Sequence, residues 1–163
     1  MPVEELAVRL CTEADLPALH AREVHPSARV AQRHFDRQQA GDYLYAVVLA
    51  DDQVLGTCAL DCDPAEPLRP ELKSLWVYPE ARRRGAGRAL TRFLEQRAAD
   101  LGFVEVFLRV DPDNAAAIPM YIGLDYSPTG DHVVTTYESV DDQGAPVSTE
   151  QTDAVYRKSL LTR

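Results

Sequence analysis

The stretch that decides the fold reads Val77-Tyr78-Pro79-Glu80-Ala81-Arg82-Arg83-Arg84-Gly85-Ala86-Gly87-Arg88-Ala89. Residues 72–77 read as a strand that stops at Pro79. After the loop, apolar residues fall at i, i+3, i+4, i+8 and i+11 and define one face of a helix: Leu90, Phe93, Leu94, Ala98 and Leu101. Gly102 closes this helix. A strand, a glycine-containing turn and an amphipathic helix therefore follow one another.

The loop has the chemistry of an anion site. The first amides of a helix lack internal partners and lie at the positive end of its dipole, and glycines let a bulky anion approach the backbone. Five arginines gather here in an acidic chain: Arg82, Arg83, Arg84, Arg88 and Arg92. The combination predicts a pyrophosphate site. The alternative is a tight turn with a solvated arginine face.

Two common nucleotide motifs do not fit this loop. No Gly-Lys-Thr or Gly-Lys-Ser sequence follows, as a P-loop would need. The third small residue of a Rossmann fingerprint would fall at the bulky Leu90.

Composition favours one globular domain over residues 1–163, with 45% hydrophobic and 26% charged residues. No apolar run reaches the ~18 residues of a membrane span. The net charge of −9 argues against a nucleic-acid partner held by bulk charge. The N-terminus is acidic and lacks a secretory signal, and three cysteines fit a reducing cytoplasm.

The remaining pattern predicts a mixed α/β domain. Thr12 and Asp15 form a capping box for a helix that runs towards His25 and stops at Pro26, and Gly41 ends a second helix over about residues 28–40. A short helix follows the turn at 111–114. Early strands are expected at 6–10, 43–49 and 54–60, with a turn at Asp51-Asp52 between the last two. A strand at 103–110 is expected to be covered on both faces. Two final strands are expected at 133–138 and 154–159, joined by a polar stretch at 141–152.

Neither the cysteines nor the histidines predict a metal site. Cys58 and Cys62 are four apart, with no further ligands at zinc-like spacing, so we interpret them as small residues on a strand and its exit. His20, His25 and His34 recur irregularly. They fit surface or half-buried positions, and contact with a substrate is the alternative.

Two motifs carry a family resemblance. Arg82-x-x-Gly85-x-Gly87, preceded by Leu75-x-Val77-x-Pro79, resembles the acetyl-CoA signature of the Gcn5-related N-acetyltransferases (GNAT). Asn114-x-x-Ala117-Ile118-x-Met120-Tyr121 resembles the second motif of that family. The motifs span about residues 71–126, a third of the chain. The resemblance implies an α/β GNAT fold with a mixed, mostly antiparallel sheet of about seven strands flanked by helices.

The resemblance also implies cofactor contacts. The backbone of Leu75, Trp76 and Val77 would pair with the pantetheine arm of acetyl-CoA as if with an added strand. Asn114 would contact the same arm, and Tyr121 would protonate the departing thiolate. Arg82 opens the signature, and the backbone amides of the seven residues after it would hold the pyrophosphate: Arg83, Arg84, Gly85, Ala86, Gly87, Arg88 and Ala89.

The implied activity is acetyl transfer from acetyl-CoA to a primary amine in a ternary complex, without a metal. The amine must first lose a proton. Glu71 stands where many relatives carry a catalytic or water-relaying glutamate. The alternative for Glu71 is an exposed carboxylate at the start of a strand. The alternatives for the base are Asp111, His132 and a chain of ordered water.

Two residues depart from the family pattern. Asp125-Tyr126 replaces the usual Gly-Phe, which predicts a left-handed Asp125. Pro119 lies inside the short helix and is expected to kink it. Both departures favour keeping an alternative function, an acyl-CoA-binding regulatory module with little catalysis. A transferase of another acyl group is a third hypothesis.

The late part of the chain suggests an acceptor class. Between residues 131 and 153 there are no lysines or arginines but six acids: Asp131, Glu138, Asp141, Asp142, Glu150 and Asp153. In the family's fold this region borders the acceptor cleft, so one hypothesis is an acidic wall that attracts a polyamine, an aminoglycoside or a basic peptide end. A solvated hairpin is the alternative. The resemblance also allows a homodimer through the late strands.

Overall fold

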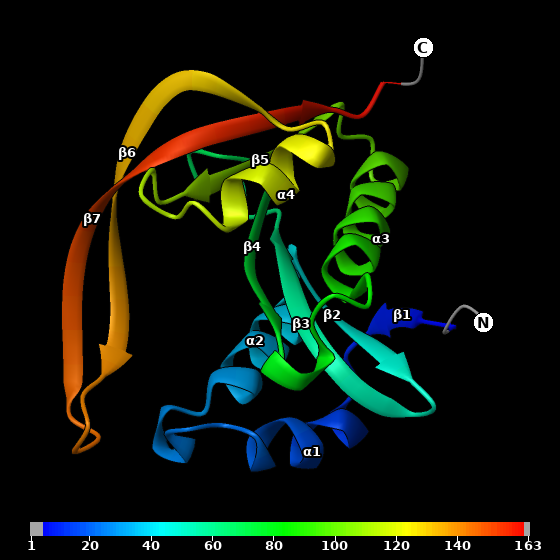
Figure 1. The fold of residues 1–163 in the computed structure, drawn as a ribbon, viewed down its shortest axis with the longest axis vertical. Coiled ribbons are helices and arrows are strands. Elements are labelled where there is room, and N and C mark those ends of the chain that lie inside the picture. The colour runs from blue at the N-terminus through cyan, green and yellow to red at the C-terminus, as the bar shows by residue number, and fades with distance from the viewer. Residues whose placement is uncertain (1–4, 162–163) are drawn as a thin grey trace.

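The computed structural model describes residues 5–161 and has one seven-stranded sheet (Figure 1). The residues before 5, which include most of the acidic N-terminus, lie outside this description. The strand order is β1-β2-β3-β4-β5-β7-β6, and β4–β5 is the parallel pair. The strands are β1 (Ala7–Leu10), β2 (Tyr43–Ala50), β3 (Gln53–Asp61), β4 (Glu71–Val77), β5 (Glu105–Val110), β6 (Ser127–Val140) and β7 (Pro146–Ser159).

Helices cover both faces of this sheet, which confirms the expected mixed α/β architecture. The α-helices are α1 (Leu16–Ala21), α2 (Val30–Ala40), α3 (Ala86–Asp100) and α4 (Ala117–Gly123). Three single-turn 3₁₀ helices accompany them: η1 (Glu13–Asp15), η2 (Pro26–Ala28) and η3 (Pro79–Ala81). None of the helices within residues 5–161 is long and apolar enough to cross a membrane.

Strand β2 separates two hydrophobic cores. Ala46, Val48 and Ala50 belong to the core that contains α3, whereas Tyr45 and Val47 belong to the core with α1 and α2. Side chains of a strand point to opposite faces in turn, so the continuous apolar run of β2 supplies both cores. The expected turn to β3 is present, with Asp51 and Asp52 at φ 49° and 65°.

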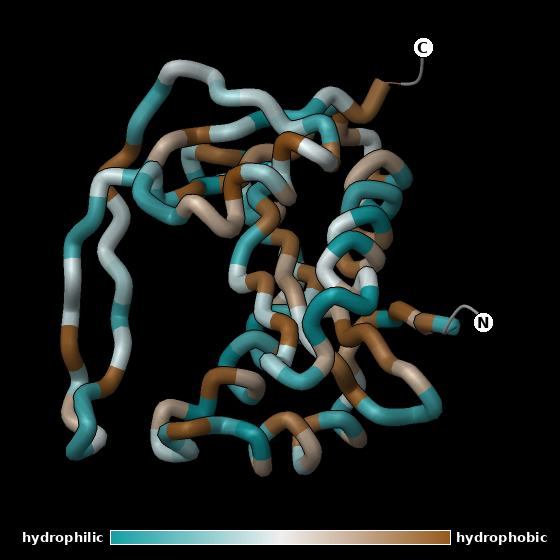
Figure 2. The backbone as a smooth tube through the Cα atoms, viewed as in Figure 1, coloured by the Kyte–Doolittle hydropathy of each residue, from teal (hydrophilic) through white to brown (hydrophobic). Residues whose placement is uncertain are grey.

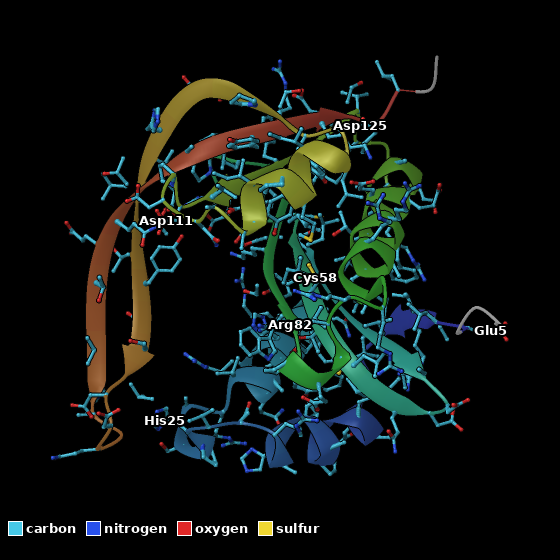
Figure 3. All side chains as sticks on the ribbon, viewed as in Figure 1. Glu5, His25, Cys58, Arg82, Asp111 and Asp125 are labelled. Carbon is cyan, nitrogen blue, oxygen red and sulfur yellow. The ribbon has the colours of Figure 1, made fainter. Side chains whose placement is uncertain are left out.

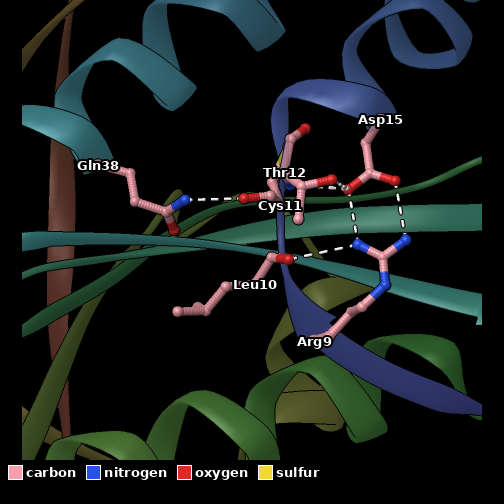
Figure 4. A network of polar contacts seen from close by, with 6 residues as sticks. All are labelled: Arg9, Leu10, Cys11, Thr12, Asp15 and Gln38. Atoms are coloured by element: carbon pink, nitrogen blue, oxygen red, sulfur yellow. Dashed lines mark hydrogen bonds and ion pairs between the residues drawn. The ribbon is translucent and has the colours of Figure 1, made fainter.

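The first helical segment is shorter than predicted. The capping box forms, because the Thr12 amide donates to the Asp15 carboxylate at 2.8 Å, and Arg9 holds the same carboxylate (Figure 4). However, α1 ends at Ala21, so the expectation of a helix reaching His25 was wrong. Pro26 opens η2 rather than stopping α1, as suits a residue with fixed φ in a first turn.

The ends of α3 and β5 also differ from expectation. Leu101 lies past the end of α3 and is 60% exposed, because Gly102 turns the chain with φ 93°. The prediction that Leu101 belongs to the apolar face of this helix was therefore wrong. Burial alternates along β5, so the prediction of a strand covered on both faces was also wrong. The polar members of the less buried face include Arg109.

The last two strands are much longer than predicted. The strands β6 and β7 have 14 residues each, and their turn spans only residues 141–145, where Gly144 has φ 80°. The polar stretch 141–152 is thus mostly strand, not a connection as expected. Figure 1 shows this hairpin projecting past the body opposite α1 and α2, and in Figure 2 its outer part is largely hydrophilic or neutral.

Replacing Leu90 by alanine should destabilise the protein by about 2–5 kcal/mol, because its side chain is fully buried against the sheet. The free energy of unfolding in urea, followed by circular dichroism, measures this loss. The matched control is Leu101→Ala, for which the exposed side chain predicts a change below about 0.5 kcal/mol. Equal losses in the two variants would contradict the described end of α3.

Candidate active site

The sheet splits along one edge of β4. Only Glu71 of β4 pairs with β5, opposite Phe107. Within the described chain, the rest of β4 pairs with β3 alone. The backbone of residues 72–77 therefore turns an open hydrogen-bonding edge toward the gap between β4 and β5. An extended amide-containing ligand can pair with such an edge as an added strand.

The far end of β4 is shaped by one close approach and one bulge. A Cβ atom at Gly56 would lie 2.5 Å from the Trp76 carbonyl oxygen, so β3 can pair this tightly only with glycine there. Ser74 has φ 58°, and the β3–β4 register shifts between Thr57 and Ala59. The bulge interrupts the hydrogen bonds between β3 and β4 near the middle of β4.

The glycine-containing loop follows directly on β4. Gly85 is the N-cap of α3 with φ 85°, a conformation that favours glycine, and Arg83 has φ 65°. Arg82 donates from Nε to the Val77 carbonyl at 3.1 Å, with its guanidinium 5.0 Å from the centre of the Trp76 ring. The predicted strand, loop and helix start are all present, and Arg83, Arg84 and Arg88 are exposed.

Gly87 marks the point where three elements meet. A Cβ atom there would lie 3.7 Å from the Met120 sulfur of α4 and 3.8 Å from Leu75 and Val77 of β4. The side chains of Leu75 and Val77 thus face α3, and the first turn of α3 lies beside both the open edge and the helix that carries Tyr121.

Helix α4 holds the second motif and carries Pro119 in its first turn. The Asn114 side-chain oxygen accepts the Ala117 amide at 3.2 Å, and the helix begins at Ala117. Pro119 is thus the third helical residue, where the missing N–H would have had no partner within the helix. The lost hydrogen bond on which the expected kink was based is therefore absent from α4. Asp125 adopts φ 73°, as predicted for its replacement of glycine.

Tyr121 lies half-buried at the inner face of α4. Its ring meets the Tyr126 ring edge-on at 6.0 Å, and burial raises the pKa of its phenol to about 12. Tyr121 and Asn114 line one pocket of about 300 Å³. The same pocket is lined by Arg109, Val110 and Asp111 of β5 and its exit, by Ala117, and by Tyr137 and Gln151 of the hairpin.

Glu71 is buried at the point where β4 and β5 part. Its carboxylate lies 3.1 Å from Nε of Arg109, which in turn donates to Thr135 at 3.1 Å. Burial raises the pKa of Glu71, although the positive charges of Arg109 and Lys73 oppose the rise. The alternative of an exposed carboxylate was wrong. Arg109 separates Glu71 from the polar pocket, which Asp111 lines but His132 does not.

A larger cleft of about 1000 Å³ lies on the side of β4 that faces α1 and α2. Its walls come from the α1–α2 segment, from residues 74–76 and 78, and from the hairpin end at residues 138–148. Figure 3 shows the labelled His25 on the segment opposite the hairpin turn. The structure therefore brings the late hairpin and the first helices to one cleft.

Two of the three early histidines line this cleft, His25 and His34. The His34 ring stacks on Tyr45 at 4.6 Å, and its Nδ1 lies 2.6 Å from the Tyr43 hydroxyl. Burial and the nearby cations Lys73, Arg37 and Arg33 lower the pKa of His34 to about 4. The ring is therefore uncharged at neutral pH.

The six acidic residues of the late segment do not form one wall. Among them only Glu138 lines the cleft. Asp153 is fully buried and accepts hydrogen bonds from Tyr137 and from Gln151 at 2.7 Å. The carboxylate of Asp141 binds backbone amides of its own turn at 2.9 and 2.8 Å. Asp141 and Asp153 thus bind groups of the hairpin itself.

Sequence reasoning missed several residues of the polar pocket. Arg109 stands in an apolar strand, and that contrast is a signal of a functional or paired cation. Tyr137 and Gln151 gave no such signal, because it is the register of the β6–β7 hairpin that places them at the polar pocket.

Cys58 and Cys62 are buried in β3 and just after it, as interpreted. Within residues 5–161, no group of three or more His, Cys, Asp and Glu side chains is placed to hold a metal ion.

Comparison with known proteins places this chain in a family of acetyltransferases. The profile of the Acetyltransferase (GNAT) family matches residues 8–125. The chain therefore belongs to the GNAT acetyltransferase family. A mycothiol acetyltransferase of Kocuria rhizophila is 36% identical over 115 residues, which are 68% of this chain but only 36% of that relative's length.

Solved structures share the fold. An N-acetyltransferase from Staphylococcus aureus Mu50 aligns with a TM-score of 0.69 at 19% identity, over 96% of this chain and 99% of its own. The Salmonella typhimurium protein yncA, solved with its cofactor acetyl-CoA, aligns with a TM-score of 0.68 at 18% identity, over 98% and 96% of the two chains. The predicted fold is confirmed.

Replacing Arg109 by leucine should destabilise the protein in a pH-dependent way. A carboxyl that holds its proton more tightly in the folded protein favours folding at low pH, and this advantage is lost as the pH rises through its folded pKa. Without Arg109, ionising the buried Glu71 costs more. We therefore expect the variant to lose about 3–5 kcal/mol near pH 8 and clearly less near pH 5.

Urea unfolding at the two pH values measures this difference. The matched control is Arg157→Leu, because Arg157 is 56% exposed and only 3.8 Å from Glu105, so its loss should be small at both values. A pH-independent loss in the Arg109 variant would show that the ion pair with Glu71 does not hold.

Proposed function

We propose that this protein is an acetyl-CoA-dependent N-acetyltransferase that moves the acetyl group directly to a primary amine in a ternary complex. The observation that carries the proposal is the open edge of β4, flanked by the Gly85–Gly87 loop and by the pocket of Tyr121. The two departures from the family pattern are compatible with this arrangement, since Pro119 lies in the first turn of α4 and Asp125 adopts the left-handed conformation. They no longer favour a non-catalytic module.

The open edge fits the pantetheine arm of acetyl-CoA. That arm carries amide groups, which would pair with the backbone of residues 75–77. The pyrophosphate would bind the amides of residues 83–89 at the start of α3, where the helix dipole and Arg83, Arg84 and Arg88 favour negative charge. Asn114, at the start of α4, would contact the same arm.

The bound thioester would place its reacting atoms between the two cavities. Attack by an amine on the acetyl carbon forms the new C–N bond and breaks the C–S bond. Of the two protons that an alkylammonium loses, one passes to solvent and one to sulfur. Tyr121 would donate to the departing sulfur, and burial keeps its phenol protonated at neutral pH. Most of the rate would come from holding amine and thioester together.

Glu71 would be the proton acceptor on the amine side. Burial raises its pKa and so makes the carboxylate a stronger base than an ordinary glutamate. Its link to the pocket runs through the neighbourhood of Arg109, so we propose that an ordered water carries the proton to Glu71.

Thermal unfolding with acetyl-CoA, CoA and ATP tests the cofactor site. A ligand at 100 times its dissociation constant adds about 2.7 kcal/mol, or several degrees for a domain of this size. We expect stabilisation by acetyl-CoA and CoA but not by ATP, together with amine-dependent release of free CoA. Stabilisation without release would favour the acyl-CoA-binding module instead, and absence of both would remove the proposal.

Replacing Tyr121 by phenylalanine should lower kcat by about 10²–10⁴-fold and leave acetyl-CoA affinity nearly unchanged, because only the proton donor is lost. Steady-state release of CoA and a binding titration give the two quantities. The matched control is Tyr156→Phe, which removes a hydroxyl from a buried tyrosine outside the pocket. An unaltered kcat in the Tyr121 variant would refute its role as the acid.

The pH profile tests Glu71. A base must be deprotonated, so kcat/KM should fall as the pH drops through the raised pKa of Glu71. In Glu71→Gln this limb should disappear and the rate should be at least about tenfold lower. Glu66→Gln is the control, at a half-buried residue of the loop before β4. It should keep the limb and move it only slightly to lower pH, because the charge of Glu66 contributes to the raised pKa of Glu71. If Glu71→Gln also keeps it, another group is the base.

A further inference from the structure

The larger cleft has an apolar wall that faces solvent. Ten large apolar side chains are strongly exposed within residues 5–161, and four of them line this one cleft: Val24, Val30, Trp76 and Val147. Their exposed fractions range from 38% for Val147 to 88% for Val24. They come from three separate parts of the chain. Exposed apolar side chains that converge from different elements typically mark a surface that binds a ligand.

The charges around this wall cancel. The lining residues include two cations, Arg22 and Arg33, and two anions, Glu23 and Glu138, in a chain whose net charge is −9. Two of the four have partners of their own. Arg22 pairs with Glu80 and stacks on Tyr78 at 3.8 Å, and Glu23 accepts the Ala31 amide at 2.9 Å. The cleft therefore offers a polycation no concentration of negative charge.

The hairpin connects the two cavities. Tyr137 lines the polar pocket that Tyr121 shares, and the next three residues of β6, 138–140, line the larger cleft. The two cavities thus adjoin along this stretch of β6. The cleft volume of about 1000 Å³ is at the upper end of the range for small-molecule sites.

We propose that the acceptor is a primary amine on an uncharged, apolar body, such as an arylalkyl or alkyl monoamine. This inference rests on the proposed function for the reaction itself and adds the class of acceptor. It replaces the cationic acceptor that the sequence suggested. The apolar body would cover Val24, Trp76 and Val147, and the amine would point to the junction with the polar pocket.

Binding and turnover with three amines test the proposal. Phenethylamine, hexylamine and spermidine are titrated calorimetrically into the protein saturated with CoA, and each is assayed with acetyl-CoA at low and high NaCl. We expect phenethylamine and hexylamine to bind at least about tenfold more tightly than spermidine, a difference of about 1.4 kcal/mol. Their kcat/KM should change little with salt, since no charge pairing is involved.

Tighter binding of spermidine, or a kcat/KM for spermidine that falls steeply with salt, would overturn the apolar acceptor. Failure of both monoamines to bind would overturn it as well. Binding of the monoamines without any acetylated product would support the acceptor class and contradict the proposed function. The two proposals can thus fail separately.

A charge placed in the wall sharpens the test. Val24→Glu should weaken phenethylamine binding by about tenfold and strengthen spermidine binding, because it puts an anion on the apolar surface. Val24 is 88% exposed, so the fold should tolerate the change. The matched control is Leu101→Glu, an equally large charge change at an exposed residue outside the cleft. Equal behaviour of the two variants would remove the wall from the acceptor site.

Discussion

The arrangement of the site depends on one broken pair of strands. β4 and β5 are parallel neighbours at Glu71 and Phe107 and then separate, so the rest of β4 keeps a free edge in the middle of a seven-stranded sheet. An unpaired inner edge is costly to leave open in water-poor surroundings and suits a ligand that supplies its own amides. The glycine loop, α4 and the hairpin all lie around this opening, so each contributes to a site that no single element could form.

The buried pair of Glu71 and Arg109 lies at the apex of the opening. It joins the last paired position of β4 to β5, and the hydrogen bond from Arg109 to Thr135 extends the link to the hairpin. A buried carboxylate is stable only with such a partner. The pair thus holds the two strands together at the point where they separate. Burial at this point raises the pKa of the Glu71 carboxyl, and the charge of Arg109 limits the rise.

Local chemistry made part of this structure predictable. The Thr12–Asp15 box, the Asp51-Asp52 turn and the glycine loop before α3 depend on neighbours in sequence, and all are present. Long-range packing decided the rest. Pro119 was expected to kink α4 because the sequence does not show that the helix begins only at Ala117, which leaves Pro119 in its first turn. The length of the hairpin was missed since most of its outer residues are polar. The acidic late segment suggested a wall, but register buries Asp153 and leaves only Glu138 at the cleft.

The position of Arg109 makes the two cavities and one ionisation interdependent. Its guanidinium lines the polar pocket while its Nε faces Glu71. Any molecule in the pocket that attracts the Arg109 guanidinium weakens its attraction to the buried Glu71 carboxylate. Glu71 then binds its proton more tightly. Thermodynamic linkage requires the reverse as well, so the protonation state of Glu71 sets how strongly the pocket holds that molecule. Binding of such a molecule in the pocket and proton binding at Glu71 are therefore coupled through Arg109.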